Sequence, residues 1–238
     1  MKKNIMTMGV IGSALKKNEK RAPLDPEHLP LIDEALRAHI YLETGYGERF
    51  GVDDATLSEQ VAGLMSREEL FAHCDIILLP KPVEDDFQYF REGQILWGRP
   101  HCVQGEAITQ VGIDKKMTFI AWEAMNVWKD GKWQMHIFQK NNELAGYASV
   151  LHALQLKGMT GSYGPAKRIA VISFGATARG AVFSLLGQGY QDITVFAQRP
   201  TFGLTNQIPG VNYESFGYVD DTSSKVVVET VDGDVPIA

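Results

Sequence analysis

The stretch that decides the fold is residues 168–199, which read RIAVISFGATARGAVFSLLGQGYQDITVFAQR. An apolar run of β-type residues comes first and leads into a turn of small residues. A helical pattern follows the turn, and a second β-type run closes the stretch. This order predicts a strand–helix–strand unit of the kind that binds a dinucleotide, and it places the protein in the α/β class.

The turn carries most of a glycine fingerprint for a pyrophosphate. We expect Gly175 to allow a tight turn and Gly180 to let the helix lie close to the strand. The backbone N–H groups at the helix start, at Ala176 and Thr177, would face the pyrophosphate. Thr177 stands where G-x-G-x-x-G has its middle glycine, and its Cβ narrows the approach. A strand–helix–strand unit without a nucleotide therefore stays open as an alternative.

The end of the second β-type run bears on the choice of cofactor. Sites that prefer NAD usually have an acidic residue there, which accepts a hydrogen bond from the ribose 2′-OH. Here the position is Gln198, and Arg199 follows it. A neutral residue does not repel a 2′-phosphate, and an arginine can bind one through two hydrogen bonds. We therefore expect NADP(H) in preference to NAD(H), with a solvated Arg199 as the alternative.

Composition argues against several classes of protein. The 238 residues carry a formal net charge of −6, whereas a nucleic-acid binder shows a basic stripe. No apolar run reaches about 18 residues, so we expect no transmembrane helix. Cys74 and Cys102 are too far apart for a disulfide framework or a metal site. These features favour a cytoplasmic protein without metal, membrane or nucleic-acid partners.

The chain reads as two α/β domains, residues 1–140 and 141–238. Predicted strands cover 5–11, 40–43, 75–79, 95–98 and 118–122, and the two β-type runs of the opening stretch cover 168–174 and 192–199. Predicted helices cover 25–38, 56–62, 67–73 and 145–157, and residues 126–139 form a predicted hairpin around the Asp130-Gly131 turn. After Gln198 only 211–218 and 226–228 suggest strands, whereas a complete dinucleotide domain has about six. We expect the second domain to be incomplete.

Polar residues follow predicted strands of the first domain. Lys81 lies between two prolines directly after the strand at 75–79, and His101 comes shortly after the strand at 95–98. Open α/β sheets bind ligands at the carboxyl ends of their strands. A lysine and a histidine there could bind a carboxylate and exchange protons near neutral pH. The basic residues at 16–21 follow the first strand, although a solvated loop explains them equally well.

Six segments in fixed order resemble the alanine dehydrogenase / pyridine nucleotide transhydrogenase superfamily. They are NEKRAPL (18–24), ETGYG (43–47), LPKP (79–82), REGQIL (91–96), GRPH (98–101) and NELAGYASVL (142–151). The last segment and the hairpin before it are most similar to the branch of N5-(carboxyethyl)ornithine synthase and lysine-forming saccharopine dehydrogenase. The resemblance implies two Rossmann-like domains with mostly parallel sheets, the first for the substrate and the second for NAD(P).

The resemblance also implies roles for three residues. Arg21 matches the family arginine that binds the carboxylate of a keto acid. Lys81 and His101 match the pair that binds and protonates the carbonyl or imine during hydride transfer. The chemistry agrees, because a guanidinium grips a carboxylate in a fork. A lysine near Arg21 and a cofactor should have a lowered pKa.

The function that we expect is an NADPH-dependent oxidoreductase acting on CH–NH bonds. It would condense pyruvate, or a similar 2-keto acid, with the side-chain amine of a basic amino acid such as ornithine. Alanine dehydrogenase, with ammonia and NADH, and saccharopine dehydrogenase, with 2-oxoglutarate and lysine, are alternatives. Because family members are longer, a non-catalytic module that binds a nucleotide or amino acid stays open too. Relatives of this kind are commonly homo-oligomers.

Overall fold

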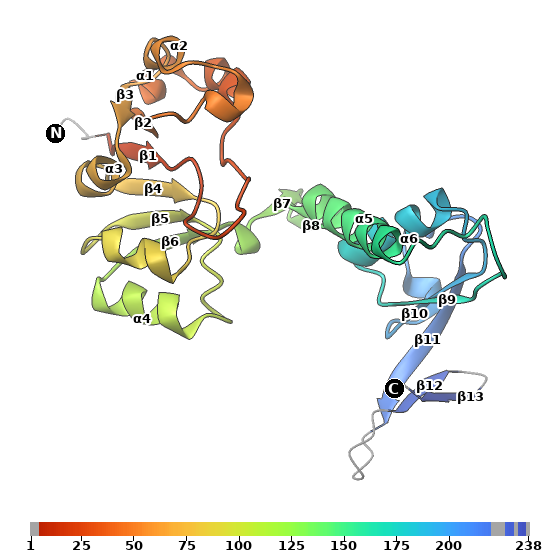
Figure 1. Cartoon of the computed structure of the whole chain (residues 1–238). Coiled ribbons are helices and arrows are strands. Elements are labelled where there is room, and N and C mark those ends of the chain that lie inside the picture. The colour runs from red at the N-terminus through yellow and green to blue at the C-terminus, as the bar shows by residue number, and fades with distance from the viewer. Residues whose placement is uncertain (1–4, 220–226, 231–232, 237–238) are drawn as a thin grey trace. The chain divides into compact units, whose positions relative to one another are not determined.

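The chain folds into two compact units. The computed structural model describes residues 5–219, 227–230 and 233–236. Contacts divide the chain into Met1–Val127 and Trp128–Ala238, whereas the sequence suggested a boundary after residue 140. Each unit contains a sheet with parallel strands and helices packed on it (Figure 1), which confirms the α/β class.

A six-stranded sheet forms the centre of the first unit. Its strands are β1 (Met8–Val10), β2 (Ile40–Glu43), β3 (Gly63–Met65), β4 (Ile76–Leu79), β5 (Ile95–Gly98) and β6 (Thr118–Ala121). The strand order is β3-β2-β1-β4-β5-β6, and every neighbouring pair is parallel. This is the order of a doubly wound dinucleotide-binding sheet. The sequence predicted five of these strands and missed β3.

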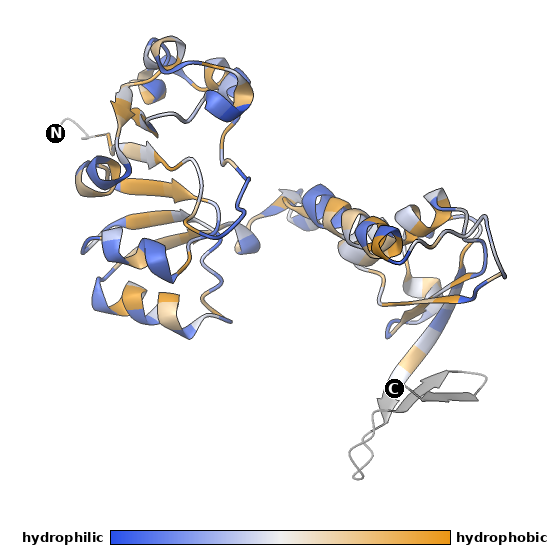
Figure 2. Ribbon diagram, viewed as in Figure 1, coloured by the Kyte–Doolittle hydropathy of each residue, from blue (hydrophilic) through white to orange (hydrophobic). Residues whose placement is uncertain are grey.

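The central strands of this sheet are largely hydrophobic (Figure 2), and their buried side chains belong to two separate core clusters. Ile77 and Leu79 of β4 point to one face, where they belong to the same buried cluster as Phe71. Leu78 points to the other face and shares a cluster with Leu57. A parallel sheet has to bury both faces, and this explains the nearly continuous apolar run Ile-Ile-Leu-Leu.

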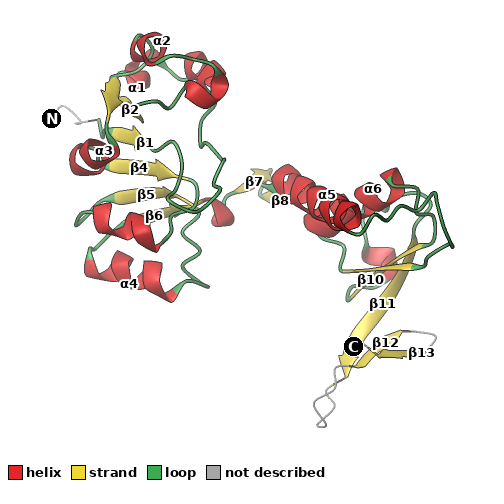
Figure 3. Ribbon diagram, viewed as in Figure 1, coloured by secondary structure: helices red, strands yellow, loops and turns green. Residues whose placement is uncertain are grey.

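Helical segments connect the strands of the first unit (Figure 3). They are η1 (Pro26–Leu31), α1 (Glu34–Arg37), η2 (Glu48–Phe50), α2 (Asp54–Ser58), α3 (Arg67–His73), η3 (Glu84–Tyr89), α4 (Glu106–Asp114) and η4 (Trp122–Ala124). The single helix expected over 25–38 was wrong. Pro30 has no N–H to donate within a helix, and Asp33 caps a new helix by accepting from the Ala35 N–H at 2.8 Å.

The boundary between the two units falls inside the first strand of the predicted hairpin. Strands β7 (Asn126–Lys129) and β8 (Lys132–His136) pair as a two-stranded sheet. Asp130 and Gly131 join them with φ angles of 50° and 70°. Two positive φ angles define the tight hairpin turn that Asp-Gly favours, so the hairpin is confirmed.

Three parallel strands carry the rest of the second unit. They are β9 (Ile169–Ile172), β10 (Ile193–Ala197) and β11 (Asn212–Val219), and they lie in the order β11-β10-β9. This is the strand order of the first half of a dinucleotide-binding sheet. Two further strands, β12 (Val227–Thr230) and β13 (Gly233–Pro236), continue the sheet antiparallel beyond β11. A short segment η5 (Thr201–Gly203) follows β10.

Two glycines allow the helices of the second unit to touch. Helix α5 (Gln139–Leu156) packs on α6 (Ala176–Gly187). A Cβ on Gly180 would lie 1.7 Å from the Glu143 carbonyl oxygen, and a Cβ on Gly146 would lie 1.8 Å from that of Thr177. The expected partner of Gly180 was therefore wrong, because this glycine lies against a helix and not a strand. None of the helices in the described part of the chain is long and apolar enough to cross a membrane.

Candidate active site

The candidate active site lies where the strand order of the first sheet reverses. Strands β1 and β4 are neighbours, but the chain leaves β1 toward β2 on one side and leaves β4 toward β5 on the other. Ligands of open α/β sheets bind outside the carboxyl ends of the strands at such a switch point. The loops that follow β1, β4 and β5 carry Arg21, Lys81 and His101 respectively, so the fold gathers the loops of all three residues at one edge of the sheet.

Close packing of β4 and β5 brings their two loops together. A Cβ on Gly98 would lie 1.9 Å from the Leu79 carbonyl oxygen, so no larger residue fits between the strands. Directly beyond it, the Arg99 N–H donates to the Pro80 carbonyl at 3.0 Å. Because Lys81 follows Pro80, its backbone is fixed beside that of Arg99.

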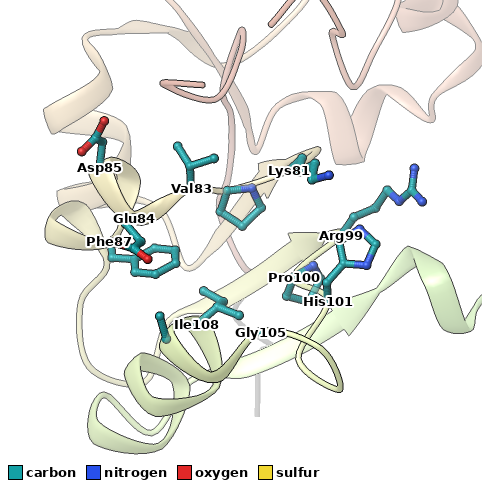
Figure 4. Close-up of a pocket in the computed structure, with 12 residues that line it drawn as sticks. Lys81, Val83, Glu84, Asp85, Phe87, Arg99, Pro100, His101, Gly105 and Ile108 are labelled. Atoms are coloured by element: carbon teal, nitrogen blue, oxygen red, sulfur yellow. The ribbon is translucent and has the colours of Figure 1, made fainter. Parts of the chain in front are cut away.

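Lys81 and His101 line one pocket of about 560 Å³. The cationic residue Arg99 joins them at one end, while Glu84 and Asp85 lie at the other end (Figure 4). Apolar and small residues make up the rest of the pocket lining: Pro82, Val83, Phe87, Pro100, Gly105, Ala107 and Ile108. The pocket therefore has cationic residues at one end and acidic residues at the other.

The electrostatics of the site single out Lys81. Partial burial lowers the pKa of its ammonium group, and the positive charges of Lys16, Arg21 and Arg99 lower this pKa further. Glu19 acts weakly in the opposite direction. The neutral amine is therefore more accessible near neutral pH than in an ordinary lysine, as proton transfer requires.

Arg21 is not among the residues that line this pocket, but its charge reaches Lys81. Its guanidinium forms an ion pair with Glu19, in which Nε donates to Oε1 at 2.8 Å. The same carboxylate oxygen accepts from the backbone N–H groups of Lys20 and Arg21. Hydrogen bonds from Arg21 lower the pKa of Glu19 to about 2. Glu19 therefore stays ionised and fixes the guanidinium.

His101 has a backbone conformation that is rare for a residue other than glycine. Its φ is 52°, in the left-handed region, which costs about 1–2 kcal/mol for an L-residue. The Glu123 carboxylate accepts from the His101 N–H at 2.6 Å, and the His101 carbonyl accepts from Gln104 and Gly105 at 2.9 and 2.8 Å. These hydrogen bonds fix the backbone of His101, whose side chain lines the pocket. Sequence reasoning assigned neither Arg99 nor Glu123, although Arg99 belongs to the GRPH segment.

The glycine-rich turn of the second unit differs from expectation in one respect. Gly175 has a φ of −84°, so the tight turn does not need it. The left-handed residue is instead Ser173, with a φ of 78° and an N–H that donates to the Phe196 carbonyl at 2.6 Å. A Cβ on Gly175 would meet nothing within 4 Å, and no side chain caps α6. Open space and uncapped N–H groups at Ala176 and Thr177 suit a phosphate group.

Gln198 and Arg199 follow β10 directly, and both are exposed. The Arg199 carbonyl accepts from the Ser215 hydroxyl at 3.4 Å, which ties it to β11. The sequence did not predict a role for Arg179, a further arginine near the turn. The guanidinium of Arg179 lies over the Phe174 ring at 4.8 Å and donates to the Asn206 carbonyl at 2.7 Å.

The part of the chain that carries the candidate active site matches a known family. The family model for the alanine dehydrogenase/PNT N-terminal domain matches residues 11–145, which is more than half of the chain. The chain belongs to the alanine dehydrogenase/PNT family. The matched range contains Arg21, Lys81 and His101.

Relatives within this family are similar over much of the chain. N(5)-(carboxyethyl)ornithine synthase of Clostridium botulinum is 27% identical over 226 residues, which cover 90% of this chain and 69% of that protein. The protein of the same name from Lactococcus lactis is 26% identical and covers 70% and 55%. Alanine dehydrogenase 2 of Staphylococcus aureus is 25% identical and covers 78% and 52%. The chain thus spans about half to two thirds of the length of these proteins.

Solved structures agree with the fold. An L-alanine dehydrogenase and a transhydrogenase from Sinorhizobium meliloti each align with a TM-score of 0.63 at 19% identity. Each alignment covers 87% of this chain, and it covers 60% and 61% of the two structures. At this identity the likeness establishes the Rossmann-like fold alone.

Proposed function

We propose that this chain belongs to an NAD(P)H-dependent oxidoreductase acting on CH–NH bonds, which joins a 2-keto acid to an amine. The observation that carries the proposal is the meeting of the Arg21, Lys81 and His101 loops at the switch point, with the pKa of the lysine lowered by its neighbours. In this proposal the first unit binds the substrates and the second binds the cofactor.

Arg21 would hold the carboxylate of the keto acid in a fork. Addition of the amine to the keto carbon gives a carbinolamine, whose hydroxyl must leave as water. Lys81 or His101 would donate the proton that this hydroxyl needs, and the resulting imine would then take up a hydride at carbon. Proton donation by a positioned side chain contributes typically about 10²–10⁴-fold to a rate.

The turn after β9 and the start of α6 would hold the pyrophosphate of the cofactor, through N–H groups at Ala176 and Thr177. The open space at Gly175 fits this role. When bound, the reduced nicotinamide supplies the hydride. Gln198 and Arg199 favour NADP(H), because an exposed arginine after the second strand can bind a 2′-phosphate.

The amine that we propose is the side chain of a basic amino acid such as ornithine. The relative with the broadest coverage described above is named for carboxyethylornithine synthesis, and the pocket has an acidic end at Glu84 and Asp85. Alanine formation from ammonia and pyruvate is the second candidate, since alanine dehydrogenase 2 also covers much of the chain.

An assay of cofactor oxidation tests the proposal. NADPH and pyruvate are supplied with L-ornithine, L-lysine or ammonia. Oxidation of NADPH is followed as the loss of absorbance by the reduced nicotinamide. We expect oxidation that depends on ornithine. Oxidation with ammonia alone would favour alanine dehydrogenase, and replacement of pyruvate by 2-oxoglutarate with lysine tests the saccharopine reaction. Nucleotide binding without oxidation under any of these conditions would support a non-catalytic module instead.

A further inference from the structure

A buried carboxylate lies behind the candidate active site. Asp86 has no exposed surface and stands in η3, after the loop that carries Lys81. Its Oδ2 accepts from the Val83 N–H at 2.9 Å. Its two oxygens also face the Leu15 N–H, at 3.3 and 3.4 Å. One side chain thus joins the loop after β1 to the loop after β4.

A largely buried arginine extends this connection to β2. Arg67, the first residue of α3, donates from Nη1 to Asp86 at 3.0 Å and from Nε to Glu43 at 3.0 Å. Its Nη2 donates to the Ser13 carbonyl at 2.5 Å. Glu43, at the end of β2, accepts from the Gly12 N–H at 2.6 Å. We refer to Glu43, Arg67 and Asp86 as the switch-point network.

We infer that the switch-point network is a positioning device, in which Asp86 fixes the distance between the loop of Lys16 and Arg21 and the loop of Lys81. Its role in catalysis rests on the proposed function, but the geometric claim stands without it. Lys16 directly follows Leu15, and Lys81 is two residues before Val83. Asp86 therefore accepts hydrogen bonds from backbone N–H groups close to Lys16 and to Lys81, two cations that repel one another.

Electrostatic repulsion explains why such a device is needed. Lys16, Arg21 and Arg99 all act on Lys81 with the same sign of charge, and repulsion would separate exposed loops of this kind. Burial raises the pKa of Asp86 more than its hydrogen bonds lower it. Burial of the ionised carboxylate therefore lowers the stability of the folded protein. Removal of one partner from a buried ion pair is strongly destabilising, because it leaves the other charge buried without compensation.

The amino ends of the same two strands provide a matched control. Asp75 accepts from the Thr7 backbone N–H at 3.0 Å and from its hydroxyl at 3.1 Å. It thus joins the starts of β1 and β4 as Asp86 joins their ends. Asp75→Asn weakens the attachment of the same strands far from Lys81, whereas Asp86→Asn weakens it beside Lys81.

The test measures the reactivity of the Lys81 amine in the full chain. Acetic anhydride is applied over a range of pH, and labelling of Lys81 and of the exposed Lys129 is measured by peptide mass spectrometry. In Asp86→Asn the loops separate, water enters and the pKa of Lys81 rises. Because only the neutral amine reacts, we expect the labelling rate of Lys81 near pH 8 to fall about threefold. We expect no change for Lys129, and no change at Lys81 in Asp75→Asn.

Two outcomes would overturn the inference: unchanged Lys81 labelling in a folded Asp86→Asn variant, or an equal change in Asp75→Asn. Circular dichroism establishes that each variant is folded. If Asp86→Asn does not fold, Glu43→Gln decides, because it removes one charge of the network at a half-buried site. The readout needs neither substrate nor cofactor, so failure of the proposed function leaves this result unaffected.

Discussion

The two candidate sites of this molecule are built from different parts of the chain. At the carboxyl ends of β1, β4 and β5, polar side chains from distant segments meet, as Lys81, Arg99 and His101 do. At the turn after β9, the available groups are backbone N–H groups, open space at Gly175 and a left-handed Ser173. We call the first the side-chain site and the second the backbone site. The side-chain site depends on hydrogen-bond networks that hold long side chains in place. The backbone site depends instead on close packing of the helix that follows the turn.

Removal of the imidazole from the side-chain site should have the largest effect. We expect His101→Asn to lower the rate of amine-dependent NADPH oxidation about 10²–10⁴-fold, as loss of a positioned proton donor does. Asparagine tolerates the left-handed backbone at this position, so the fold should persist. Steady-state kinetics with the exposed His152→Asn as control measure the effect. Equal rates for His101→Asn and the unmodified protein would remove His101 from the mechanism.

Packing should matter most at the backbone site. Gly180→Ala places a Cβ 1.7 Å from the Glu143 carbonyl oxygen, so α5 and α6 must separate. We expect a loss of about 1–3 kcal/mol in the free energy of unfolding, measured by urea denaturation. Gly175→Ala is the control, since its Cβ would enter open space and stability should not fall. A stable Gly180→Ala variant would show that the helices are not held by this contact.

Cofactor choice should respond to one exposed residue at the backbone site. We expect Arg199→Ala to weaken NADPH binding about tenfold or more and to leave NADH binding nearly unchanged, because only NADPH has a 2′-phosphate. Fluorescence titration with both nucleotides measures the two affinities. The exposed Arg168, before β9, serves as control in Arg168→Ala. Equal losses for NADPH and NADH would contradict a 2′-phosphate role for Arg199.

The smallest expected effect concerns acid stability at the side-chain site. Arg21 lowers the pKa of Glu19 from 4.5 to about 2. A lowered carboxyl pKa stabilises the folded state fully above pH 4.5, and this contribution is lost as pH falls toward 2. We expect Glu19→Gln to show a flatter fall in the free energy of unfolding between these pH values. Parallel curves for both proteins would mean that the ion pair does not stabilise the fold.

Local patterns in the sequence were sufficient for much of the fold. The run at 75–79 predicted a buried strand, the β-type run at 192–199 predicted a further strand, and Asp130-Gly131 predicted the hairpin turn. Strand β3 has three residues and begins with Gly63, so neither its length nor its composition marks a strand. Its pairing with β2 depends on tertiary contacts that a local pattern does not contain.

Some residues of the candidate sites could likewise be predicted from local sequence patterns, whereas others come together only in the folded structure. Lys81 and His101 could be predicted, because both come within three residues of the end of a recognisable strand. The switch-point network could not, since Arg67 and Asp86 are ordinary charged residues whose meeting requires the folded sheet. The sequence did not indicate Ser173, because glycine is the usual residue at a positive φ and the nearest glycine is Gly175.

The measurement that tests the central claim most directly is the binding of pyruvate to the side-chain site. Isothermal titration compares the unmodified chain with Arg21→Gln, Lys81→Met and the distant control Arg37→Gln. Loss of a charged hydrogen-bond partner costs about 1.5–3 kcal/mol, so we expect Arg21→Gln and Lys81→Met to weaken binding about tenfold or more while Arg37→Gln binds normally. Pyruvate affinity that is the same in all four proteins would contradict a keto-acid site at these strand ends.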